Sequence, residues 1–186
     1  MRRLIVTALL VAGCAREAAP RGPEQELIAR LGLLVTQGAE AVATLYDLEI
    51  RQKADLFDEI ARAPGPDRLK ILEAARPRLG EEAALGTLRA EIASEIGAPL
   101  RTALARGGCS YGPALPADVT RYAHFELPRP TPEMGPRIGQ FLFDLHREIG
   151  YITSGRVSCP GGASAWLQLV KRKGRQEPLR ILRIRT

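Results

Sequence analysis

The stretch EQELIARLGLLVTQGAEAVATLYDLEI, residues 24–50, determines the expected fold of the first half of the chain. Apolar or small residues recur in it at alternating steps of four and three, which places them on one face of a helix. The stripe continues to Ile60, and Pro64-Gly65-Pro66 ends it. We therefore expect one long helix that begins after Pro23. The residues of the stripe are Leu27, Leu31, Leu34, Gly38, Ala41, Leu45, Leu48, Leu56 and Ile60.

A second helical run is expected up to residue 106. Asp67 can cap its start, Pro77 kinks or splits it, Pro99 is a further bend, and Gly107-Gly108 ends it. Two helical runs joined by a short turn favour an antiparallel hairpin. The apolar positions of the second run are Leu69, Leu72, Leu79, Leu85, Leu88, Ile92, Ile96 and Leu100.

The second half of the chain mixes both periodicities. The apolar pattern from Met134 to Ile149, preceded by Thr131 as a cap, predicts an amphipathic helix. Alternation of apolar and polar residues predicts strands, of which the last two form a hairpin. We therefore predict an α+β fold: an N-terminal antiparallel helical hairpin, then a small antiparallel sheet with one packed helix. The predicted strands are Val119–Leu127, Tyr151–Val157, Ala165–Lys171 and Leu179–Arg185.

Composition is that of an ordinary globular protein with a basic C-terminal half. The 186 residues are 45% hydrophobic and 26% charged, with a net charge of +6. Residues 24–106 hold 11 basic and 14 acidic groups, whereas residues 107–186 hold 12 basic and 6 acidic ones. Arginine predominates among the basic residues, which fits either phosphate recognition or a compositional bias of the genome. Two His and three Cys argue against a zinc finger or a His-rich metal site.

The first residues have the order of an export signal. Met1-Arg2-Arg3 is followed by an apolar run, Leu4–Ala12, which is shorter than the roughly 20 residues that a membrane-spanning helix needs. The next residues complete Val11-Ala12-Gly13-Cys14, which resembles the lipobox of bacterial lipoproteins. The alternative is a buried N-terminal helix with a chance cysteine, but the unbroken apolar run makes a poor amphipathic helix.

The resemblance implies a signal peptide over residues 1–13 and a lipid on Cys14. In lipoproteins the cysteine thiol carries a diacylglycerol, and its amine carries an acyl chain such as palmitate. Ala15 follows the cysteine where an Asp usually retains a lipoprotein at the inner membrane. The resemblance therefore places the chain in the cell envelope, on the periplasmic face of the outer membrane in a Gram-negative organism.

Two cysteines remain after Cys14. Cys109 and Cys159 both lie in Gly-rich turns, and an exported chain meets an oxidising compartment in which leftover thiols most often pair. We therefore predict a Cys109–Cys159 disulfide. The alternative, a catalytic thiol, lacks any nearby thiol-enzyme signature.

No strong catalytic motif is present, so we expect no enzymatic activity, metal or cofactor. The enzyme alternative is a modifier of envelope polymers that uses Tyr122, His124 and Glu126, which alternate along one predicted strand and share its face. A third hypothesis concerns the basic C-terminus. It is a charged sheet edge, a site for anionic glycolipid or, least expected, a nucleic-acid surface. Its candidate anion-binding residues are Lys171, Arg172, Lys173 and Arg175.

Together these observations predict a chain in four parts. Residues 1–13 are the signal peptide and residues 14–23 a lipidated tether. Residues 24–106 form a helical segment and residues 107–186 an α+β segment, which pack as one compact unit. We expect a cell-envelope lipoprotein with a binding, scaffold or assembly role. Its partners are the membrane, through Cys14, and another envelope protein; nucleic acid is not an expected partner.

Overall fold

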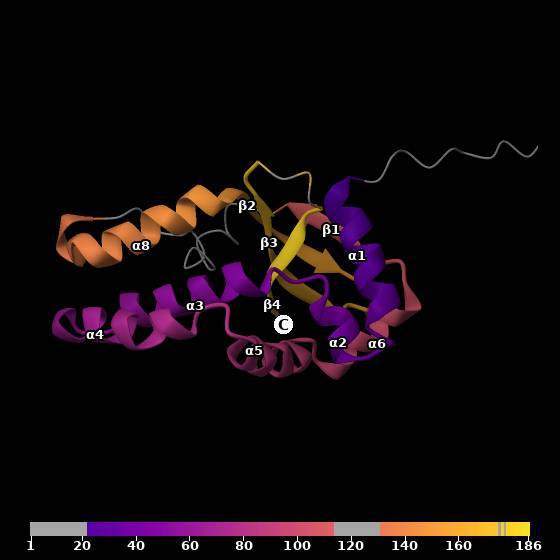
Figure 1. Cartoon of the computed structure of the whole chain (residues 1–186). Helices are drawn as coiled ribbons and strands as arrows, with labels where there is room; N and C mark the ends of the chain where they lie inside the picture. Colours follow the sequence, from indigo (N-terminus) through magenta and orange to yellow (C-terminus); the bar gives the residue numbers. More distant parts are fainter. Residues whose placement is uncertain (1–21, 114–130, 175, 177) are drawn as a thin grey trace, which may run out of the picture.

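The computed structural model describes residues 22–113, 131–174, 176 and 178–186. A four-stranded antiparallel sheet lies at the centre, in the order β1-β2-β3-β4 (Figure 1). The mixed helix and antiparallel-sheet class is therefore confirmed. The predicted strand over Val119–Leu127 lies outside the described residues. The strands are β1 (Ser110–Pro113), β2 (Ile149–Ser158), β3 (Ser164–Arg172) and β4 (Arg180–Arg185).

The long first helix is wrong, because the stripe is divided among three helices. These are α1 (Pro23–Leu34), α2 (Ala39–Ala43) and α3 (Leu48–Arg62). Gly38 ends the first part with a φ of 107°, a conformation that favours glycine. The second break, between α2 and α3, allows the backbone there to bond to the edge of the sheet. Ile181 of β4 donates to the Leu45 carbonyl and accepts from the Asp47 amide, at 2.9 and 3.0 Å.

The second helical run divides at the predicted proline positions. It forms α4 (Gly65–Ala75), a 3-10 turn (Arg76–Arg78), α5 (Glu82–Glu95) and α6 (Ala98–Arg106). The start differs from the prediction, because Pro64 precedes the first helical residue and Asp67 lies in the first turn. Since α3 and α4 are joined by only Ala63 and Pro64, they fold back and pack on each other.

The helix predicted after Thr131 is α8 (Gly135–Glu148), preceded by a 3-10 turn at Pro132–Met134. Thr131 makes no capping bond to a backbone amide; its hydroxyl donates to the Glu133 carboxylate instead. The buried stripe of α8 contains Ile138, Leu142 and Leu145. A buried helix face of this kind anchors α8 against α3 and β2.

Both faces of the sheet are covered, so β3 is buried along most of its length. Successive side chains of a strand point to opposite faces. Leu167 and Leu169 pack in a core with residues of α1, α5 and α6. Val170 packs with Leu145 of α8 and with residues of α3. In Figure 1, α1, α2 and α6 accordingly lie at one end of the molecule, away from α8.

The helices α3, α4 and α8 extend beyond the sheet as an arm (Figure 1). The arm has its own apolar cluster, formed by Leu56, Ile60, Leu72 and Ile138. At its surface an ion pair joins Arg137 of α8 to Glu73 of α4. Among the described helices, none is both long and apolar enough to cross a bilayer.

Cys109 and Cys159 form the predicted disulfide, with an S–S length of 2.05 Å. The bond joins the residue before β1 to the residue after β2, and both cysteines are buried. It thereby fixes the short strand β1 at the edge of the sheet, where Ser110 is opposite Ser158.

Candidate functional site

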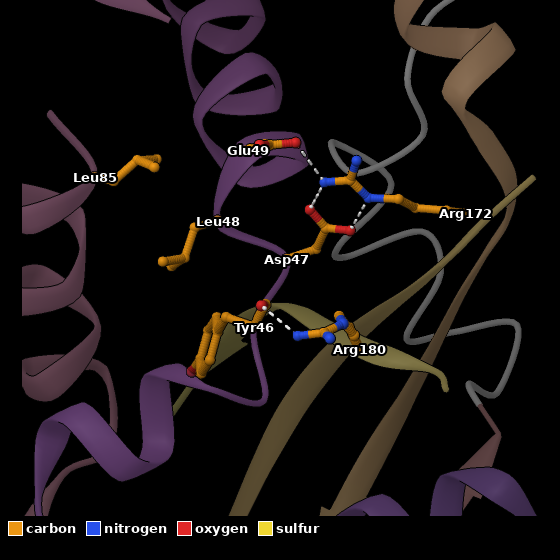
Figure 2. Close-up of a pocket in the computed structure, with 7 residues that line it drawn as sticks. All are labelled: Tyr46, Asp47, Leu48, Glu49, Leu85, Arg172 and Arg180. Atoms are coloured by element: carbon orange, nitrogen blue, oxygen red, sulfur yellow. Dashed lines mark hydrogen bonds and ion pairs between the residues drawn. The ribbon is translucent and has the colours of Figure 1, made fainter. Parts of the chain in front are cut away.

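A cavity of about 300 Å³ lies where α3 begins, beside β3 and β4 (Figure 2). The segment that leads into α3 forms one side of it, and this segment is held in place by its backbone hydrogen bonds to Ile181. Leu48 and Leu85 supply an apolar wall, whereas the opposite side is charged. The lining residues are Tyr46, Asp47, Leu48, Glu49, Leu85, Arg172 and Arg180.

Asp47 is the buried acid of this site, with only 4% of its surface exposed. One carboxylate oxygen accepts from the backbone amide of Ile50 at 3.2 Å and so caps α3. Arg172 donates to the two carboxylate oxygens from Nε and Nη2, at 2.6 and 2.5 Å. This bidentate pair compensates a charge that would be costly to bury alone.

Arg172 is also bound by Glu49, at 2.9 Å from Nη2. The hydrogen bonds with Asp47 outweigh partial burial and, together with Glu49, raise the pKa of Arg172 above its usual value. The guanidinium therefore stays charged at physiological pH. Its charge is already used by two carboxylates inside the protein.

Arg180 differs from Arg172 in its partners. Its Nη1 donates to the backbone carbonyl of Thr44 at 3.0 Å. It also donates to the backbone carbonyl of Tyr46 at 3.5 Å (Figure 2). No carboxylate of the described chain lies at ion-pair distance from it. Arg180 thus holds the segment before α3 through neutral backbone acceptors.

A second polar network lies behind Tyr46. The Tyr46 hydroxyl donates to Glu95 of α5 at 3.2 Å, and Arg51 of α3 binds the same carboxylate at 2.6 Å. Glu95 also accepts from the backbone amide of Ile184 in β4, at 3.3 Å. Burial, followed by the nearby Glu95 charge, raises the pKa of Tyr46 well above its usual value. Glu95 therefore ties α5 to both α3 and β4.

Arg51 and Arg183 extend this network to the far side of α3. Burial alone would lower the pKa of Arg51, but Asp55 and Glu95 outweigh it and raise that pKa. Arg183 of β4, which is almost fully buried, binds Asp55 and lies 2.7 Å from Asp58. Basic and acidic groups therefore alternate from α5 across α3 to β4, and each compensates its neighbours.

Most charged residues of this site form ion pairs with one another. Its carboxylates accept hydrogen bonds from arginines. Within the described ranges, no group of three or more His, Cys, Asp or Glu side chains could hold a metal ion. The arrangement positions α3, α5 and β4 relative to one another.

Of the predicted anion-binding residues in the described chain, Arg172 is paired with the carboxylates of Asp47 and Glu49. Lys171 and Arg172 are the last residues of β3, and Arg172 faces Asp47. Lys173 follows them in the turn, where its backbone amide donates to Glu148 at 2.8 Å. Arg175 lies outside the described residues, as do Cys14, Tyr122, His124 and Glu126.

Sequence reasoning missed Asp47, Arg51, Glu95 and Arg183. Asp47 had a local signal, since an Asp three residues before Ile50 is a typical helix cap. Arg51 and Asp55 also have the spacing of an ion pair on one helix. Arg183 falls in the predicted strand Leu179–Arg185, and the structure buries it against α3.

No protein-family model, curated protein or solved structure matches this chain.

Proposed function

We propose that this chain is a lipid-anchored protein of the bacterial cell envelope, whose folded part binds another envelope protein. The observation that carries the proposal is the pairing of Cys109 with Cys159 in a chain that starts with a lipobox-like stretch. Disulfides persist in the periplasm and outside the cell, whereas cytosolic thiols are kept reduced. A signal with Cys14 and a buried disulfide thus support the same compartment independently.

The arm supplies the surface that we propose for the protein partner. Its hairpin of α3 and α4 packs with α8, and α8 presents an exposed aromatic ring, Phe143, with 52% of its surface accessible. The guanidinium of Arg147 lies 5.8 Å from the centre of that ring. Tyr151 is exposed shortly after the same helix. Aromatic and arginine side chains of this kind are enriched among residues that dominate protein interfaces.

The anchor is tested by the intact mass of the membrane-extracted protein, measured with and without reduction and alkylation. We expect a mass that starts at Cys14 and includes acyl chains, with two thiols that react only after reduction. An unprocessed mass with three reactive thiols would contradict both the anchor and the exported location.

The partner surface is tested by photocrosslinking in intact cells. A photoreactive residue at Phe143 should give a discrete crosslinked protein, identified by mass spectrometry. The matched control is Thr87, which is exposed on α5, a helix outside the arm. Equal crosslinking from both positions, or none from Phe143, would contradict the arm as the binding surface.

A further inference from the structure

A second cavity, of about 440 Å³, follows the contact between α1 and α6. Its walls include Ile28 and Leu33 of α1 and Leu104 and Ala105 of α6, and none of its lining residues is charged. At Gly32 the two helices approach closely, because an added Cβ would lie 2.8 Å from the Leu104 carbonyl oxygen. The result is a shallow groove with an apolar rim.

Leu33 stands at this rim and is 69% exposed, the most of any large apolar side chain in the described chain. Leaving such a side chain in water is unfavourable, and exposed apolar side chains beside a groove are typical of contact surfaces. Leu33 lies on the last turn of α1, and α1 lies beside α6 at the end of the molecule opposite the arm (Figure 1).

The charges beside Leu33 are positive. Arg30 is three residues before it on the same helix, hence on the same exposed side, and Arg106 follows Ala105 at the end of α6. Both arginines are exposed, and within the described chain neither has an ion-pair partner. The acidic residues of α1, Glu24 and Glu26, lie in its first turn. Glu26 is about 10 Å from Leu33 along the helix axis, close to one screening length in physiological salt.

The start of α1 limits how far this surface can be from the lipid. Seven residues lie between Cys14 and Gly22, and the eight Cα-to-Cα steps of a fully extended chain span at most about 28 Å. α1 itself is about 18 Å long. An anchored chain therefore keeps the start of α1 within about 28 Å of the membrane, and Leu33 within about 45 Å.

We propose that Arg30, Leu33 and Arg106 form a membrane-contact surface that rests on an anionic phospholipid bilayer, with Leu33 inserted among the lipid chains. The proximity argument rests on the proposed lipid anchor, whereas the exposed leucine and the two cations do not. Basic residues near a membrane are attracted to anionic lipid headgroups. This orientation directs the arm away from the bilayer, toward a partner.

The test is depth-dependent quenching in vesicles that contain the intact mature protein. L33W is reconstituted in phosphatidylcholine with phosphatidylglycerol, of which a part carries brominated acyl chains. We expect the Leu33→Trp fluorescence to fall at least twofold relative to unbrominated vesicles, after subtraction of the native Trp166 signal. The matched control is L69W, since Leu69 is also exposed (39%) but lies on α4 in the arm. Its quenching should be small.

The cations are tested by adding R30E and R106E to the L33W variant. This double reversal should remove most of the quenching, whereas R76E with R78E, on the 3-10 turn after α4, should leave it unchanged. If L33W and L69W are quenched equally, or L33W is not quenched, the membrane-contact surface is wrong.

Flotation of the same vesicles and the intact mass separate this proposal from the anchor. A chain that carries acyl chains and floats, but shows no quenching at residue 33, retains the anchor and overturns the surface. A chain without acyl chains that is quenched at residue 33 supports the surface and overturns the anchor.

Discussion

The two edges of the sheet are closed by different chemistry. At β4, the segment before α3 pairs with Ile181, and buried ion pairs hold Asp47 and Glu95 in place. At β1, a covalent bond joins Cys109 to Cys159. There Gln25 of α1 also accepts from the Tyr111 amide at 2.9 Å and donates to the Cys109 carbonyl at 2.8 Å. An exposed strand edge invites pairing with other chains, so each closure protects the monomer.

Because the two edges are closed differently, different conditions should weaken them. The β1 closure depends on the redox state of its surroundings and on a loop with a sequence separation of 50 residues. The β4 closure depends on charges that are far apart in sequence and mostly shielded from solvent. Reducing conditions should therefore loosen β1 and spare β4, whereas removal of single charges should do the opposite.

The largest effect is expected from loss of the disulfide. The double variant C109S with C159S should lower the free energy of unfolding by about 4 kcal/mol, because the unfolded chain regains the entropy of the closed loop. Urea unfolding of the oxidised wild type and the variant measures it. Hydrogen exchange should accelerate first at Tyr111 in β1, with little change at Ile181 in β4. A loss under about 1 kcal/mol would mean that Gln25 and the α1 packing hold this edge without the bond.

The next effect is expected at Asp47. D47N keeps an oxygen that can cap α3 but leaves Arg172 with one charged partner, Glu49. We expect a loss of about 2 to 3 kcal/mol, less than for a fully orphaned buried charge, because Glu49 remains. E49Q is the matched control, since Glu49 is more than half exposed, and should cost under about 1 kcal/mol. Equal losses in the two variants would show that burial of Asp47 adds nothing.

These long-range pairs mark the limit of what the sequence could predict. The strands β2, β3 and β4 and the helix α8 follow from local periodicity and from Gly and Pro at their ends. The disulfide followed from the number of cysteines left beside the export signal. The short strand β1 carried no such pattern, since Gly112 and Pro113 are poor strand residues.

The prediction of one long first helix was wrong because tertiary contacts interrupt it. Its spacing suits one helix, but Gly38 has a positive φ, and the backbone at Tyr46 forms a β-bridge with Ile181 of β4. Both features interrupt the helix. The site could not be predicted from the sequence for a similar reason. Asp47 and Arg172 are 125 residues apart, and no local pattern relates two such positions. Only the folded sheet brings the end of β3 to the start of α3.

A smaller effect on the β4 closure is expected at Glu95. E95Q removes the charge that Arg51 binds but keeps an acceptor for the Tyr46 hydroxyl. Loss of one charge-assisted hydrogen bond should cost about 2 kcal/mol in urea unfolding. E91Q is the control on the same helix, because Glu91 is exposed, and should change stability by less than about 0.5 kcal/mol. If E95Q is also neutral, the network does not hold α5 to β4.

The smallest effect is expected at Tyr46, and its signature is a pH dependence. Y46F removes one hydrogen bond to Glu95 and should cost about 1 kcal/mol at neutral pH. Burial and Glu95 raise the pKa of Tyr46 in the folded state, so the folded protein keeps its proton where unfolded tyrosine, with a pKa of about 10, loses it. The stabilising contribution is therefore fully present below about pH 10 and declines as the pH rises above that value.

Urea unfolding of wild type and Y46F between pH 8 and 11 measures this decline as a shrinking difference between their free energies of unfolding. Tyr111, whose pKa burial also raises, remains in both proteins and cancels from that difference. A difference that stays constant up to pH 11 would show that Tyr46 ionises as readily in the fold as in the unfolded chain, and that the closure of β4 does not shield it.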